Sequence, residues 1–294
     1  MAETEPLIRW PQPLLEAAGF LASFLASGAV GFRYAALRRL GGAPDDVRRV
    51  RDGAARGAAG LGLTGVVVAV ILLATRLPGL AARRHMTVPE LVTGDRATAL
   101  QVVLLIMALA GFALALGRRG IGWPLAAIGV VGGALRSAFF GQWARTVNPV
   151  HMLAGGMWIG TLFVLVAVGL ATVLRSPLAP ERRGALAAEM VNGFSPLALG
   201  SAAVLAIFGA ITAWTHLKHL SALWTTPYGF ALITKLCVVL AVVALGAWNW
   251  RRQKPRLGSE AAALALRGSA RAELAVAAVV LAITAVLVSL PSPR

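Results

Sequence analysis

Long apolar runs separated by short polar segments dominate this chain. A helix needs about 20 largely apolar residues to cross a bilayer, because every backbone polar group must be satisfied inside the lipid. Eight runs meet this length, at about 14–37, 58–76, 97–116, 121–140, 149–174, 195–217, 228–250 and 272–290. The pattern therefore predicts an all-α fold, a polytopic membrane bundle of eight transmembrane helices.

The polar segments between these runs are too short to form a soluble domain. We expect residues 41–57 to form a polar loop, 76–96 to hold a short interfacial helix, and 258–271 to form an amphipathic segment. Equal division of the eight spans predicts an N-terminal four-helix half, 1–142, and a second four-helix half, 143–294. Together they would form one membrane domain.

Composition and charge fix the class and the orientation. The chain is 58% hydrophobic and only 14% charged, far from the roughly 25% charged residues of soluble domains. Its net charge of +16 could indicate nucleic-acid binding, but the cations are unevenly distributed. The loops after spans 1, 3, 5 and 7 hold 18 of them, against eight on the opposite side. The positive-inside rule then places both termini outside, in the periplasm or its equivalent, and we expect no nucleic-acid partner.

Three of the four histidines lie at the predicted outer ends of spans. His151 opens a span, and His216 and His219 close the next one three residues apart, so they share a face if the helix continues. Imidazole and thioether ligands suit Cu(I). The histidines could bind Cu or Zn, and a methionine ligand would favour Cu(I), so we predict a metal site made by His151, His216 and His219, with Met152 or Met157. The remaining His85, beside Met86 in an outer loop, is more simply a solvated residue.

Other positions are notable for packing or charge. Trp158 lies two helical turns after His151 on the same face, and Gly156 with Gly160 forms a G-x-x-x-G pair that lets a neighbouring helix approach closely. Lys235 lies inside a span and is expected to face the bundle interior, because a cation in lipid is costly. Glu16 is the carboxylate best placed to pair with such a cation.

The motifs of hydrolases and nucleotide-driven enzymes do not occur. The chain has no P-loop, CxxC, HExxH or Ser-His-Asp arrangement, and no paired carboxylates in its spans. We therefore expect a protein that is not an enzyme.

Four segments in register resemble the copper-resistance protein D (CopD) family. They are NPVHMLAGGMWIGTLFVL (148–165), GFSPLALGSAAVLAIFGAITAW (193–214), TTPYGFALITKLCVVLAVVALGAWNWRR (225–252) and RAELAVAAVVLAITAVLVSLPSP (271–293). The resemblance covers about residues 145–293 and places His151, Trp158, Tyr228, Lys235 and Asn249 at motif positions. It implies a polytopic inner-membrane protein that moves copper, often beside a periplasmic copper-binding partner, CopC.

Two other functions remain open at this point. A b-type haem could be held between His151 and His216, which would make the chain an electron-transfer subunit. Alternatively, the glycine seams could serve a structural or assembly subunit of a larger membrane complex. The first four spans carry no histidine, so a complete copper path across the membrane is not evident from the sequence.

Overall fold

The computed structural model describes residues 10–40, 44–217, 219–253 and 256–290, and these residues form helices without a strand ladder. The long helices are α1 (Gln12–Gly31), α2 (Asp45–Arg83), α4 (Arg96–Leu116), α5 (Gly122–Leu135), α9 (Pro180–Leu217), α11 (Pro227–Trp248) and α12 (Glu260–Leu287). A further long helix is divided into α6 (Val147–Gly155), η5 (Gly156–Gly160), α7 (Thr161–Val164), η6 (Leu165–Gly169) and α8 (Leu170–Leu174). The shorter elements are η1 (Phe32–Ala36), η2 (Arg38–Leu40), α3 (Val88–Gly94), η3 (Ala138–Phe140), η4 (Trp143–Thr146), α10 (Ala222–Thr225) and η7 (Asn249–Gln253).

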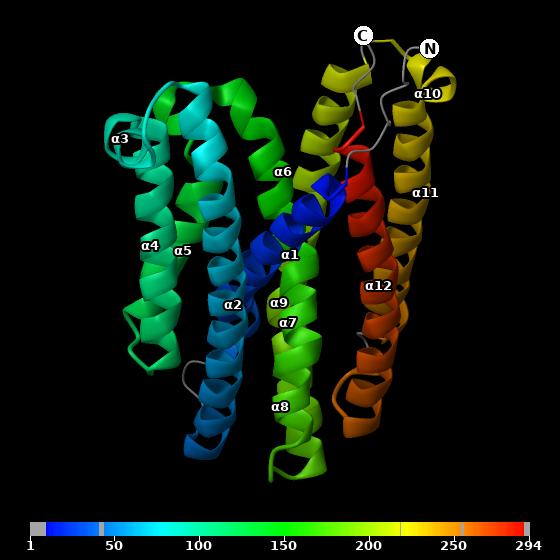
Figure 1. Ribbon diagram of the computed structural model, residues 1–294. Coiled ribbons are helices and arrows are strands. Elements are labelled where there is room, and N and C mark those ends of the chain that lie inside the picture. The colour runs from blue at the N-terminus through cyan, green and yellow to red at the C-terminus, as the bar shows by residue number, and fades with distance from the viewer. Residues whose placement is uncertain (1–9, 41–43, 218, 254–255, 291–294) are drawn as a thin grey trace.

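The helices run up and down along one common direction (Figure 1). The start of α1 and the end of α12 lie at the same end of the bundle, together with α3 and α10. The connections from α4 to α5, from α8 to α9 and from α11 to α12 lie at the opposite end. α1 is the exception to the common direction, because it crosses the middle of the bundle obliquely.

Seven helical segments of the described chain are long and apolar enough to cross a membrane. They are Gln12–Ala36, Asp45–Arg83, Arg96–Leu116, Ala144–Leu174, Pro180–Thr215, Pro227–Arg252 and Glu260–Leu287. The polytopic all-α class is therefore confirmed, but the eighth span is not. α5 has 14 residues and a length of about 21 Å, short of the roughly 30 Å of a hydrocarbon core. Arg136 follows it and turns back to donate to the Gly133 carbonyl, at 3.2 Å.

Two segments expected to lie outside the spans are continuous with them. The predicted polar loop 41–57 is wrong for most of its length, because α2 begins at Asp45. Two carboxylates in its first turn, Asp45 and Asp46, favour a helix start there by interacting with the helix dipole. Likewise the amphipathic segment 258–271 is the first part of α12, which begins at a Ser259 cap.

The short helix expected within residues 76–96 is present as α3. Thr87 and Glu90 form a capping box at its start, and Asp95 caps the following helix by accepting from the Thr98 backbone N–H at 3.0 Å. Hydrogen bonds from Thr98 and then Arg84 hold the pKa of Asp95 below its usual range. This cap fixes the turn that reverses the chain between α2 and α4.

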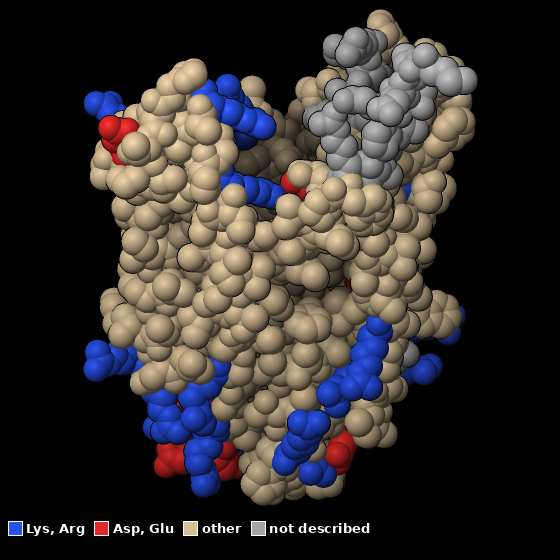
Figure 2. Space-filling model, viewed as in Figure 1, with Lys and Arg blue, Asp and Glu red and all other residues tan. Residues whose placement is uncertain are grey.

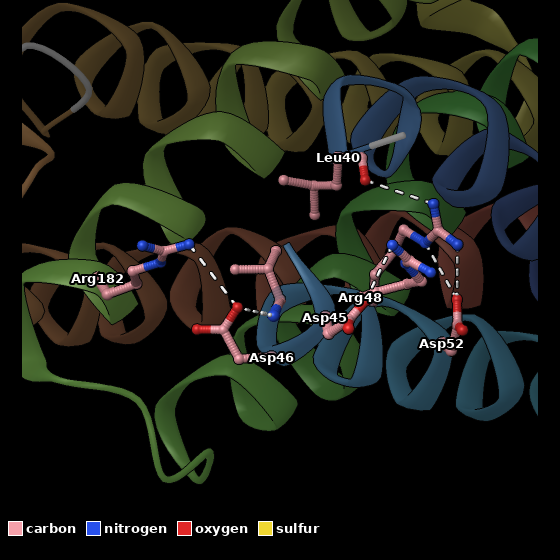
Figure 3. Close-up of polar contacts among 8 residues, drawn as sticks. Leu40, Asp45, Asp46, Arg48, Asp52 and Arg182 are labelled. Carbon is pink, nitrogen blue, oxygen red and sulfur yellow. Dashed lines mark hydrogen bonds and ion pairs between the residues drawn. The ribbon is translucent and has the colours of Figure 1, made fainter. Parts of the chain in front are cut away.

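Polar contacts tie together the end of the bundle where α2 and α9 begin (Figure 3). Arg182, near the start of α9, reaches the Asp46 carboxylate at 3.8 Å, and Arg51 donates to the Leu40 carbonyl at 3.4 Å. Arg48 pairs with Asp45 at 3.0 Å within α2. Exposed pairs of this kind contribute little stability each. Their effect is to link three chain segments at the arginine-rich end, whose cations are prominent in Figure 2.

Glycines bring α1 into backbone contact with the helix that starts at α6. The end of α1 is fully buried, and the Gly28 backbone lies against the Gly160 backbone. Thr161 donates to the Gly28 carbonyl at 3.4 Å, and Gly156 lies against the Ser27 side chain. The predicted close approach at Gly156 and Gly160 is therefore confirmed, with α1 as the partner helix. Because α1 also packs on α2, one core joins both predicted halves.

Candidate functional site

His151 lies on α6 at the end of the bundle opposite the arginine-rich loops (Figure 1). α6 packs against α9, and the imidazole lies over Gly209 and against the backbone of Leu205. A side-chain carbon at Gly209 would come within 3.0 Å of His151 Cε1, so the glycine is what makes room for the ring. The Nδ1 atom is buried and has no hydrogen-bond partner among the described residues.

Lys235 is close enough to His151 to interact with it electrostatically. It lies on α11, is half-buried, and has no ion pair among those formed by the described residues. The carboxylate considered for it is engaged elsewhere, since Glu16 pairs with Arg76 at 3.2 Å. That expectation was wrong because α1 is tilted and presents Glu16 to α2. The buried Nδ1 of His151 and the ammonium group of Lys235 therefore lie in the same region of the bundle.

The other predicted copper ligands are not gathered around His151 by the described residues. Met152 follows it and is half-buried, whereas the Met157 sulfur lies near Gly31 of α1. α9 ends at Leu217, so the exposed His219 lies beyond the helix and the two histidines do not form a helical i, i+3 pair. The side chain of His216 lies outside the described residues. Within the described chain, no group of three His, Cys, Asp or Glu side chains could hold a metal.

Trp158 faces the same neighbour as His151 but lies deeper in the bundle. It lines a cavity of about 360 Å³ that also includes Phe194 and Ala198 of α9. The helix changes to a π-helix at residues 156–160, and such segments often occur at functional sites. Tyr228, the first motif residue of α11, is buried in a small apolar cluster with Leu232 and Leu287.

Asn249, at the other end of α11, belongs to a buried polar network. Its Nδ2 donates to the Glu273 carboxyl at 3.0 Å, and its Oδ1 accepts from the Ser269 hydroxyl. Asn249 and Glu273 are both buried and both line the Trp158 cavity. Asn249 was predicted as a motif position, but its network with Glu273 and Ser269 was not. The signal in the sequence is Glu273, an acidic residue that opens the apolar run ELAVAAVV, where a carboxylate is costly.

A second cavity opens at the arginine-rich end, beside the π-helical turn of η1. It has a volume of about 560 Å³ and is lined by Tyr34, Arg38, Arg39, Asn192 and Pro196, among others. Both arginines are exposed.

Together these features define a multi-pass α-helical membrane protein with a histidine region near one end and a buried carboxyl network nearer the other. Residues 188–287 match the family model of Copper resistance protein D, so the resemblance to the CopD family predicted for residues 145–293 is confirmed over that stretch. It contains α11, α12 and most of α9. The chain is also similar to the copper transport protein CutJ of Bacillus subtilis (strain 168), with 30% identity over 181 residues.

The two similarities have different extents. The CutJ alignment covers 58% of this chain and 31% of the relative, so the chain spans about a third of the length of the curated relative it matches. The family match begins after His151 and Trp158 and includes Lys235, Asn249 and Glu273. No solved structure matches the chain.

Proposed function

We propose that this protein is a copper-handling protein of a bacterial inner membrane, and that His151 is a ligand for Cu(I) at its outer end. Copper is the substrate, which the protein binds and passes on without changing it chemically. The observation that carries the proposal is the buried, unpartnered Nδ1 of His151. A buried polar nitrogen without a hydrogen bond is costly, and a metal ion would satisfy it.

The similarity to CopD and CutJ supports copper as the substrate. The ligand types agree, because an imidazole followed by a thioether, His151 and Met152, suits a soft monovalent ion. His216, near the end of the neighbouring helix α9, and the exposed His219 beyond it are the further candidate ligands, and they would have to move towards His151 to join the site. A periplasmic copper-binding protein of the CopC kind would deliver the ion to this end.

The ligand assignment is tested by measuring Cu(I) binding to the purified full chain in detergent. Titration against a colorimetric Cu(I) chelator under reducing conditions gives the affinity and the stoichiometry. We expect His151→Ala to remove most of the binding. His85→Ala is the matched control, because His85 is exposed and lies just after α2, far from His151 in the sequence. This variant should bind copper like the unmodified protein.

Two outcomes would contradict the proposal. Unchanged copper binding by a folded His151→Ala variant would remove His151 from the site. An intense Soret band in the purified protein, lost in both His151→Ala and His216→Ala, would instead favour the haem function. Single variants at His216 and His219 then measure the share of each histidine in the copper site.

A further inference from the structure

Glu273 is an unusual side chain for the interior of a membrane helix. It lies in α12 and is only 4% exposed, and it is the one acidic side chain that is buried among the described residues. None of the ion pairs within the described chain includes it. An ionisable residue in such a place is costly and is therefore usually functional.

The neighbouring helix is shaped to receive this carboxyl group. Asn249 donates to one carboxyl oxygen and is itself oriented by the Ser269 hydroxyl. The other oxygen lies beside Gly246, one turn earlier on α11, where a side-chain carbon would come within 3.2 Å of it. Gly246, Asn249, Ser269 and Glu273 thus form a built polar site between two helices that pack closely along their length.

A cavity of about 360 Å³ adjoins this site. Its walls are mostly apolar, and the polar groups that line it with Glu273 are Asn249, Ser195 and Arg251. Arg251 belongs to η7, in the arginine-rich part of the chain, so the cavity extends from the carboxyl towards that end of the bundle.

Arg251 is the charged side chain that shares the cavity with Glu273. The other charged groups on the packed helices are directed elsewhere. Arg252 stacks on Trp248, Arg267 donates to the Val166 carbonyl, Arg271 and Glu189 are exposed, Arg183 pairs with Glu260, and Glu16 pairs with Arg76. Lys235 lies 14 residues earlier on α11 than Asn249, about 21 Å along the helix.

One amide donor does not compensate a buried negative charge, whereas a bound proton removes that charge. We propose that Glu273 is an intramembrane proton-binding site, held by Asn249, that exchanges its proton with water at the arginine-rich end through the cavity. The proton passes between cavity water and a carboxyl oxygen, and no other bond changes. This assignment stands independently of the copper ligands at the opposite end.

The test is labelling of the full chain in detergent with dicyclohexylcarbodiimide, an apolar reagent for protonated carboxyl groups. The carboxyl proton moves to a carbodiimide nitrogen while the carboxyl oxygen bonds to the central carbon, and the adduct rearranges to a stable N-acylurea. Peptide mass mapping locates the label. We expect label on Glu273, falling about tenfold per pH unit once the carboxyl loses its proton. Glu273→Gln should abolish it, and Glu189→Gln, at an exposed glutamate, should not.

Two results would overturn the proposal. One is a folded protein without label on Glu273 at any pH, and the other is labelling that does not change with pH, since a proton that never leaves is not exchanged. If Glu273→Gln fails to fold, infrared spectra of the unmodified protein replace it. A protonated carboxyl band that disappears as pH rises supports the site, and its absence at every pH contradicts it. Cu(I) binding by Glu273→Gln, measured separately, distinguishes failure here from failure of the copper site.

Discussion

At the scale of single residues, the ammonium of Lys235 bears on the proposed copper site. It lies close enough to His151 to interact with it electrostatically, so it would repel a cation bound to the imidazole. Repulsion would weaken copper binding there. Lys235 would thus set how tightly the outer end holds copper.

Replacement of Lys235 by leucine should therefore tighten Cu(I) binding. The change keeps an apolar side chain and removes the charge without adding a thioether that could itself bind copper. A tenfold gain in affinity corresponds to about 1.4 kcal/mol, a reasonable size for a partly screened charge pair. The chelator competition measures it directly. Lys235→Arg is the control, because it keeps the charge and should leave affinity near the original value. Equal affinities for Leu, Arg and Lys at this position would show that the charge does not affect copper binding.

The sequence predicted the role of single residues correctly where the residue spacing within one helix was enough. Gly156 and Gly160 were recognised from their spacing, and the structure supplies α1 as their partner. Gly209 and Gly246 could not be recognised, because each makes room for a side chain of another helix, His151 and Glu273 respectively. Such pairings depend on tertiary packing, which helix periodicity does not contain.

At the scale of helices, α1 and η5 are in direct backbone contact in the core of the bundle. Backbone meets backbone at Gly28 and Gly160, so no rotation of a side chain can relieve an added methyl group there. The oblique path of α1 through the core follows from this close approach. In lipid no hydrophobic effect drives helices together, so close packing at small residues is an important source of helix association.

Gly160→Ala should therefore destabilise the protein severely. We expect a loss of about 3 kcal/mol or more, which is the upper range for overpacking when the backbone itself must move. Gly200→Ala is the matched control, since it lies in α9 with nothing within 4 Å of an added carbon, and alanine there should stabilise by up to about 1 kcal/mol. Thermal unfolding in detergent, monitored by size-exclusion chromatography of heated samples, compares the stabilities of the two variants. Similar stabilities would contradict the backbone contact.

The helices were predicted more accurately than the connections between them. Apolar runs identified each long helix, because lipid requires apolar side chains along the whole span. The boundaries were less accurate, since α2 and α12 continue into charged segments where water satisfies the arginines. α5 was expected to be a full span because hydropathy alone does not show that its helix stops at Leu135, one residue before Arg136.

At the scale of the whole molecule, polar groups occur at different depths along one side of the bundle. His151 and Lys235 lie towards one end, and Asn249 with Glu273 towards the other, on the helices α6, α11 and α12. The cavity lined by Asn249 and Glu273 has mostly apolar walls and does not include His151 or Lys235. Copper binding at one end and proton exchange at the other would thus act through a shared set of helices.

The orientation of this arrangement in the membrane is the last prediction. Arginines concentrate at the end that holds the connections before α9 and α12, and the positive-inside rule assigns that end to the cytoplasm. Single-cysteine variants in a Cys237→Ser background test it in intact bacterial cells with a membrane-impermeant maleimide. Ser221→Cys, exposed beside α10 at the His151 end, should be labelled from outside. Ala179→Cys, exposed before α9 at the arginine-rich end, should be labelled only after the membrane is permeabilised. The reverse pattern would place His151 on the cytoplasmic side, and the proposed site would then receive copper from the cell interior, not from a periplasmic partner.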